Sequence, residues 1–217
     1  MIKDLSIFFK KETLVMGGLG FSAGLPIMLV FSTLSVWLVK AGVERSTVTL
    51  FSWAGFAYSF KFLWSPIVDK FRLPILNQYG HRRSWLFFSQ ILIIISILLA
   101  SLSDPQKNLS FMAISIVLIA FSSATQDIII DAFRIESAPE KKQGPLASMY
   151  LAGYRVAMIV SGAGSLWLAS HFSGSVYQLE VWKNVYQIIS LFMLIGLIST
   201  FFAKEPLMLK KNNIKNF

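Results

Sequence analysis

Residues 84–102 read SWLFFSQILIIISILLASL, a run of nineteen residues without one charged side chain. An α-helix rises about 1.5 Å per residue, so about 20 apolar residues span the ~30 Å hydrocarbon core of a bilayer. This run and the similar ones along the chain predict an all-α membrane protein, a single bundle of six transmembrane helices over residues 1–217. The other five stretches are residues 14–39, 46–68, 109–131, 146–170 and 184–203.

The composition supports a membrane location and argues against catalysis. Hydrophobic residues make up 55% of the chain and charged residues only 14%, whereas soluble domains carry about 25% charged residues. The connections are too short for a soluble catalytic domain, so we expect no enzyme. Because the chain has no cysteine, and His81 and His171 lie on opposite sides of the predicted bundle, we expect no metal site and no cofactor. The first stretch is too long for a secretory signal peptide, so none is expected.

The net charge of +9 is unevenly divided between the two sides of the bundle. Fourteen Lys and Arg residues lie on one side, in the N-terminal segment, the second and fourth connections and the tail, and four lie on the other side. Short connections rich in Lys and Arg stay in the cytoplasm. We therefore expect both termini to be cytoplasmic and the positive charge to meet anionic membrane lipid rather than nucleic acid.

Small residues recur at helical spacing in the first and fifth stretches. Such stripes let membrane helices pack closely, and they would equally suit helices that rock against each other during transport. The sequence leaves both interpretations open. Pro26 also lies in the first stretch and is expected to kink its helix. The stripes consist of Gly17, Gly20 and Gly24, and of Gly153, Ala157, Ser161 and Ser165.

Four ionisable side chains fall inside the apolar stretches, toward the cytoplasmic side: Lys61, Asp127, Asp131 and Arg155. Charges inside a membrane pair with one another or line an aqueous pathway. Asp127 and Asp131 are four residues apart and share a helix face, where mutual repulsion would let one of them exchange a proton. The alternative is a structural cluster, in which these carboxylates pair with Arg134, Lys61 or Arg155 and fix the helix register.

The connection between the second and third stretches carries a motif. It reads WSPIVDKF at residues 64–71 and GHRR at residues 80–83. This resembles the signature of the major facilitator superfamily between its second and third helices, in which a small residue precedes an Asp, a basic residue, a Gly and paired basic residues. Two features depart from that signature. Ser65 stands where the superfamily usually has Gly, and residues 72–79 separate the two parts.

Further motifs resemble the AmpG muropeptide permease branch of that superfamily, and the acetyl-coenzyme A transporter family shares similar features. The motifs are GFSAGLP at residues 20–26, ATQDIIIDAFR at residues 124–134 with Glu136, and Tyr154-Arg155. The resemblance implies the N-terminal half of a proton-coupled transporter that imports anhydro-muropeptides across the bacterial inner membrane for peptidoglycan recycling.

The intramembrane charges and the resemblance together assign roles to two groups of residues. The expected substrate and proton pathway comprises Lys61, Gln126, Asp127, Asp131 and Arg155. The expected cytoplasmic gate comprises Asp69, Lys70, Arg82, Arg83, Arg134 and Glu136.

The resemblance covers one six-helix half, whereas carriers of this superfamily use two halves around a site near the midplane. Three interpretations stay open: a truncated or split form without activity, a half that pairs with a separate chain, and a half that associates with itself. Two alternative functions also stay open. One is a non-transporting membrane scaffold or remnant that keeps the fold, and the other is a carrier like the acetyl-coenzyme A transporters.

The charge distribution makes the topology testable. A reporter that is active only in the cytoplasm should work when it is fused after Lys211 or inserted within residues 72–79, because the Lys and Arg bias places both positions inside. Activity restricted to an outer-side reporter at these positions would reverse the assignment.

Overall fold

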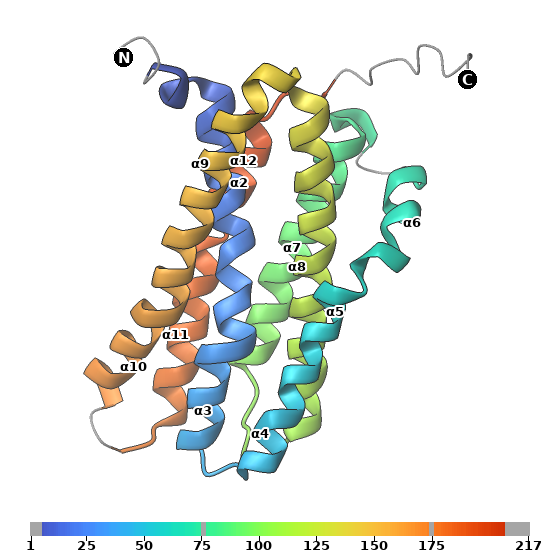
Figure 1. The fold of residues 1–217 in the computed structure, drawn as a ribbon. Helices are drawn as coiled ribbons and strands as arrows, with labels where there is room; N and C mark the ends of the chain where they lie inside the picture. Colours follow the sequence, from blue (N-terminus) through green and yellow to red (C-terminus); the bar gives the residue numbers. More distant parts are fainter. Residues whose placement is uncertain (1–5, 75–76, 174–175, 207–217) are drawn as a thin grey trace.

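The computed structural model describes residues 6–74, 77–173 and 176–206, which form a bundle of helices running between two ends (Figure 1). Within this part of the chain, five helices are long and apolar enough to cross a membrane. They confirm the all-α membrane fold and correspond to five of the six predicted stretches. The five are Lys11–Lys40, His81–Ser101, Leu109–Ser137, Glu140–Ser173 and Leu179–Phe202.

Two of these helices are continuous, namely α7 (His81–Ser101) and α8 (Leu109–Ser137). The other three change their winding part-way. A π-helical turn at Leu29–Thr33 joins α2 (Lys11–Met28) to α3 (Leu34–Lys40), and a second at Val160–Gly164 joins α9 (Glu140–Ile159) to α10 (Ser165–Ser173). The last helix divides at Met193 into α11 (Leu179–Phe192) and α12 (Leu194–Phe202). Short 3₁₀ turns lie at Ser6–Phe9 and Asn77–Tyr79.

The two π turns lie side by side in the middle of the bundle. A π turn is wound more widely than an α-helix, which changes which backbone carbonyls accept a hydrogen bond from an N–H of the same helix. A buried carbonyl without such a bond needs another donor. The Thr33 hydroxyl donates to the Ser161 carbonyl oxygen at 2.8 Å, which links the two turns directly. The buried Tyr186 hydroxyl of α11 donates to the Leu29 carbonyl oxygen at 2.9 Å. Three helices are thus tied together where their winding is irregular.

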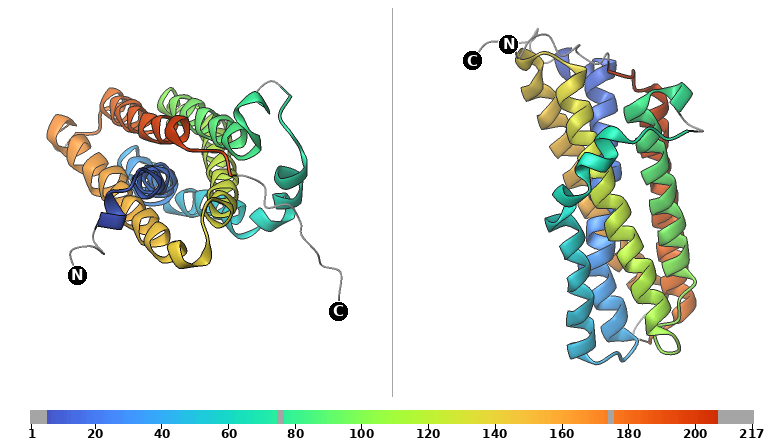
Figure 2. Two further views of the ribbon diagram at one scale, coloured as in Figure 1. Left: turned by 90° about the horizontal axis from the view of Figure 1, so that it is seen from above. Right: turned by 90° about the vertical axis from the view of Figure 1, so that its right-hand side faces the viewer.

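The small-residue stripes of α2 and α9 face each other. Seen from above, α2 lies within the bundle and α9 runs beside it (Figure 2). A Cβ atom on Gly20 would overlap the Tyr150 carbonyl, and one on Gly153 would overlap the Gly17 carbonyl. The backbones therefore touch directly, as small residues permit in membrane helices. This confirms the close packing predicted from the stripes.

The predicted second stretch, residues 46–68, is not one continuous helix, which corrects the sequence prediction. It runs along the bundle from one end toward the other as a series of short pieces (Figure 1). The backbone leaves helical geometry at Phe60 and lies at its margin at Trp64. The pieces are α4 (Arg45–Phe51), a 3₁₀ turn at Ser52–Gly55, α5 (Phe56–Ser59), a 3₁₀ turn at Lys61–Leu63, and α6 (Ser65–Lys70).

Pro66 supplies the physical reason for the last break. A continuous helix would bond the N–H of residue 66 to the carbonyl of Phe62, but proline has no N–H and its ring clashes with that carbonyl. The Ser65 hydroxyl donates to the Phe62 carbonyl oxygen at 3.1 Å in its place. Pro66 instead lies in the first turn of α6, where its missing donor is tolerated.

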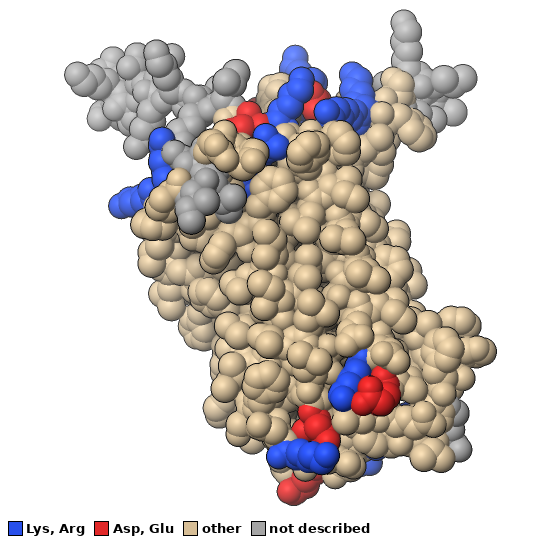
Figure 3. All heavy atoms as spheres, turned by 180° about the vertical axis from the view of Figure 1, so that it is seen from behind, with Lys and Arg blue, Asp and Glu red and all other residues tan. Residues whose placement is uncertain are grey.

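One side of the bundle has the surface of a lipid-facing helix layer. Figure 3 views the molecule from behind, and its charged side chains gather near the two ends, with a broad area between them free of Lys, Arg, Asp and Glu. Helices α7, α11 and α12 lie on this side (Figure 2). Their outward side chains include Ile91, Ile95 and Ile198, which are all exposed. Apolar side chains without polar neighbours suit hydrocarbon.

The contact between α2 and α9 predicts that small substitutions there are costly. Gly20→Ala and Gly153→Ala should each lower the free energy of unfolding by about 1–3 kcal/mol, because the added methyl group overlaps backbone that cannot rotate away. Gly144→Ala is the matched control, since a Cβ at Gly144 meets open space. Equal stability of all three variants in lipid bicelles would show that the helices do not approach this closely.

Candidate functional site

The first turn of α7 is held by a carboxylate from the far end of the chain. The backbone N–H groups of Arg82 and Arg83 donate to the two Glu205 carboxylate oxygens at 2.8 Å and 3.0 Å. These N–H groups have no partner within their own helix, and the helix dipole favours a negative charge here. Gly80 precedes the helix with a φ of 101°, and a Cβ at that position would overlap the Glu205 carboxylate.

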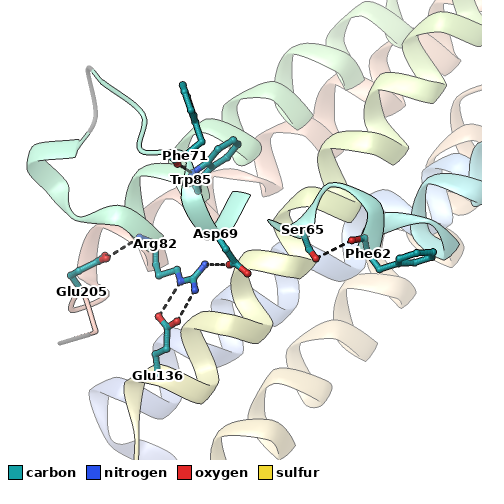
Figure 4. Close-up of polar contacts among 8 residues, drawn as sticks. All are labelled: Phe62, Ser65, Asp69, Phe71, Arg82, Trp85, Glu136 and Glu205. Atoms are coloured by element: carbon teal, nitrogen blue, oxygen red, sulfur yellow. Dashed lines mark hydrogen bonds and ion pairs between the residues drawn. The ribbon is translucent and has the colours of Figure 1, made fainter. Parts of the chain in front are cut away.

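The Arg82 side chain joins two further carboxylates (Figure 4). Its guanidinium donates to both oxygens of Glu136 on α8, at 2.9 Å and 2.6 Å, and to Asp69 on α6 at 2.7 Å. Only 11% of the Arg82 side chain is exposed. A two-pronged contact between a guanidinium and a carboxylate is short, strong and directional. Arg82 therefore ties α6 and α8 to the start of α7.

Arg83 extends the network to α12. Its guanidinium donates to the carbonyl oxygens of Thr200 and Phe201 at 3.2 Å and 3.0 Å. These carbonyls belong to the last turn of α12, where backbone acceptors lack helical partners and a positive charge is favoured. Trp85 adds a further tie, because its indole N–H donates to the Phe71 carbonyl oxygen at 2.8 Å, just beyond α6. Four elements thus meet at one end of the bundle.

The structure brings together only part of the predicted gate. Asp69, Arg82 and Glu136 form one cluster, whereas Arg83 binds backbone carbonyl oxygens of α12. Arg134 instead lies 3.7 Å from Asp131 on its own helix and bonds Gln143. Lys70 is exposed.

Glu205 is the member of this cluster that sequence reasoning missed. It lies 123 residues after Arg82 and makes its contacts through backbone N–H groups. A faint signal was available, because an acidic residue two positions after the last apolar stretch, followed by Pro206, is unusual in a basic tail.

The predicted pathway residues divide between two faces of α8. Asp127 lies on the side of the second segment and α9, where the charges of Lys61 and Asp131 act on it. Gln126, the preceding residue, points into the bundle and is fully buried; its amide nitrogen donates to the Ser22 hydroxyl at 2.8 Å. Arg155 is exposed on α9 and its guanidinium reaches the Met158 sulfur. Lys61, rather than Arg155, is therefore the cation that faces Asp127.

A second polar contact lies inside the bundle, near Gln126. The Thr200 hydroxyl of α12 donates to the Gln90 side-chain oxygen of α7 at 2.9 Å. Both side chains are fully buried. A Cβ atom on Gly196 would approach both Ser22 and the Gln90 amide too closely. The Gln126–Ser22 and Thr200–Gln90 contacts are therefore neighbours. Hydrogen bonds between helices hold a membrane bundle where no hydrophobic drive acts.

Comparison with known proteins agrees with this architecture. Residues 16–216 match the family model of the Major Facilitator Superfamily. The chain belongs to this superfamily. It is 37% identical to the anhydromuropeptide permease of Escherichia coli strain K12 over 93% of this chain and 39% of that protein. It is also 37% identical to a Rickettsia felis protein that bears the name AmpG 4, over 74% of this chain and 39% of that protein.

These matches confirm the resemblance to the AmpG branch, and with it a multi-pass membrane fold of transporters rather than enzymes. An uncharacterized protein of Haemophilus influenzae is 34% identical over 93% of this chain and 45% of its own length. The chain thus spans less than half the length of the curated relatives that it matches. As expected for the N-terminal half of a superfamily member, the motif connection lies between the second segment and α7.

The cluster around Arg82 predicts strong coupling between its members. Arg82→Ala and Glu136→Ala should each destabilise the bundle, and the double variant should recover about 1–3 kcal/mol relative to the sum of the two losses, because each single change leaves a charge unpaired. Lys70→Ala, at an exposed position, is the control. Strictly additive losses in the free energy of unfolding would exclude the coupling.

Proposed function

We propose that this chain forms the N-terminal half of a proton-coupled transporter that imports anhydro-muropeptides, for peptidoglycan recycling, across the bacterial inner membrane. The observation that carries the proposal is the 37% identity to the Escherichia coli anhydromuropeptide permease over 93% of this chain. The distribution of charge on the bundle supports it.

The bundle has two unlike sides. The side in Figure 3 is free of charge between its ends. The opposite side, which faces the viewer in Figure 1 and is seen from above in Figure 2, is formed by the second segment, α8 and α9. These three elements carry the intramembrane charges Lys61, Asp127, Asp131 and Arg155. Charges at membrane depth are costly against lipid and mark the lining of a pathway. This side is therefore the one that a second bundle would cover.

Alternating access requires such a second bundle, because one bundle cannot close both sides of a site in turn. A sugar-peptide is large and polar, and one half could not shield it from lipid. The second half would be supplied by further polypeptide, by a separate chain or by self-association. In this arrangement the cluster of Asp69, Arg82, Glu136 and Glu205 stiffens the cytoplasmic end, and its members are the proposed gate.

Asp127 is the proposed proton acceptor. It lies in the half of α8 nearer the Arg82 cluster, and its carboxylate oxygen Oδ1 is buried without a hydrogen-bond partner among the described residues. Lys61 and Asp131 act on it from the second segment and from α8 itself. A carboxylate that is only partly compensated can gain and lose a proton as its surroundings change.

The proposal predicts that the monomeric chain alone does not transport. Reconstituted in proteoliposomes under an imposed proton gradient, it should take up no labelled anhydro-muropeptide. A chimera in which this chain replaces the matching segment of the Escherichia coli permease should restore uptake. Asp127→Asn should abolish the gradient-dependent part of that uptake, while Glu180→Gln, an exposed change at the other end, should leave it intact.

Each outcome of this experiment is decisive. Gradient-driven uptake by a preparation proved monomeric by cross-linking would refute the need for a second half. A chimera that takes up labelled acetyl-coenzyme A instead would favour the acetyl-coenzyme A transporter-like alternative. A folded chimera that moves neither solute would favour the scaffold.

A further inference from the structure

The side of the bundle seen in Figure 3 holds a groove between α7 and the helices α11 and α12. Its volume is about 930 Å³, and sites that bind small organic molecules usually measure about 300–1,000 Å³. The groove is lined by Ile94 and Leu98 near the end of α7 and by residues from the start of α11 onward. It therefore occupies the half of the bundle away from the Arg82 cluster.

The lining changes from charged to polar to apolar along α11. Glu180, Asn184 and Gln187 follow one another at spacings of four and three residues, so they share one face of the helix. All three are exposed. Leu191 and Leu194 come next along the groove, and both are exposed as well. At 1.5 Å per residue, the polar part extends over about 10 Å before the apolar part begins.

The two amides lie too deep to suit hydrocarbon alone. Asn184 and Gln187 are about 7 Å and about 12 Å along the axis from Leu179, where α11 begins. An amide that is moved from water into hydrocarbon without a hydrogen-bond partner loses free energy. Elsewhere on this side the outward residues are apolar, as at Ile91 and Ile95. The amides therefore indicate a partner that offers hydrogen-bond acceptors at this depth.

The charged end of the groove presents a carboxylate. Of the described residues that line the groove, Glu180 is the charged one. Its Oε1 accepts a hydrogen bond from Lys183 Nζ at 2.7 Å. The Glu180 side chain is 75% exposed and that of Lys183 only 23%. The carboxylate is thus the more accessible charge, and it favours an ammonium group on the ligand, while the adjacent Lys183 favours a phosphate.

A lipid fits this lining better than a second copy of the chain does. Two copies inserted in the same direction would be related by an axis along the membrane normal, so each residue would meet its counterpart at the same depth. Glu180 would then approach a second Glu180, and like charges repel. Close packing of membrane helices also relies on small residues, whereas the exposed lining here consists of large side chains such as Leu98, Ile188 and Leu191.

We propose that this groove binds one membrane phospholipid whose headgroup carries a primary ammonium group, as in phosphatidylethanolamine. The ammonium group donates to the Glu180 carboxylate, and the phosphate lies toward Lys183. The Asn184 and Gln187 amides donate to the ester carbonyl oxygens of the lipid.

One acyl chain of the lipid lies along Ile94, Leu98 and Leu191. Charged, amide and apolar side chains thus follow the order of headgroup, ester and acyl chain in the leaflet away from the Arg82 cluster. The inference goes beyond the proposed function and does not depend on it, because the groove lies on the side opposite Lys61 and Asp127.

The test is native mass spectrometry of the chain released from nanodiscs that contain equal amounts of phosphatidylethanolamine and phosphatidylcholine. Both lipids are zwitterionic, but only the first has ammonium N–H donors. The chain should retain one phosphatidylethanolamine with a preference of about tenfold, because a hydrogen bond between charged groups is worth at least about 1.4 kcal/mol. Glu180→Gln should reduce the preference to about twofold or less. Asn184→Leu combined with Gln187→Leu should weaken retention about tenfold.

Reversing the charge gives a result that an unfolded variant could not give. In nanodiscs of phosphatidylethanolamine and phosphatidylglycerol, Glu180→Lys should lose the retained phosphatidylethanolamine and retain one more phosphatidylglycerol, which is anionic. Glu44→Gln and Thr49→Leu are the matched controls, because both positions are exposed and lie beside or within α4 at the same end of the bundle. Both controls should keep the preference of the unchanged chain.

Two results would overturn the inference. The first is equal retention of phosphatidylethanolamine and phosphatidylcholine by the unchanged chain, or a preference that persists in Glu180→Gln. The second is efficient disulfide-linked dimerisation of Asn184→Cys in nanodiscs, which would assign the groove to a second copy of the chain. That variant is diagnostic because the chain has no other cysteine.

Discussion

The direct contact between the backbones of α2 and α9 is the constraint on which the rest of the bundle depends. Gly20 and Gly24 of α2 lie against the carbonyl groups of Tyr150 and Tyr154 on α9, with no room for a side chain between them. That approach brings the two π turns together, so that Thr33 can bond the Ser161 carbonyl. It also sets the two tyrosines beside α8, where the charge of Asp127 acts on both.

The broken second segment is attached to the bundle in a different way from α2 and α9. Where α2 and α9 are locked by backbone contact, residues 45–70 are held to α8 by side chains such as Trp64. A segment whose helical hydrogen bonds are interrupted at Phe60 and Trp64 keeps fewer backbone bonds of its own. In a membrane, irregular backbone is tolerated only where protein or a water-filled cavity covers it. The break lies on the side that carries Lys61 and Asp127, which is the side that the proposed second bundle would cover.

Hydropathy predicted five of the six segments well, because length and apolar character are local properties that a bilayer demands. It failed for residues 46–68, since the break depends on how Pro66 meets the Phe62 carbonyl, a geometric detail that apolar character does not report. The motif at residues 64–83 located Asp69 and Arg82, whereas Glu205 escaped because its bonds go to backbone N–H groups. The charge of Lys61, rather than that of Arg155, acts on Asp127, because side-chain direction decides which cation lies nearer and helical spacing alone left this open.

Helix α8 contributes Glu136 to the network around Arg82 and also carries Asp127. The broken second segment carries Asp69 at one end and is attached to α8 through Trp64. Tyr58 and Lys61 lie on that segment. The contacts of Arg82 and the surroundings of Asp127 are therefore both attached to α8 and to the broken segment. Trp64 attaches that segment to α8 by one indole hydrogen bond and by ring packing.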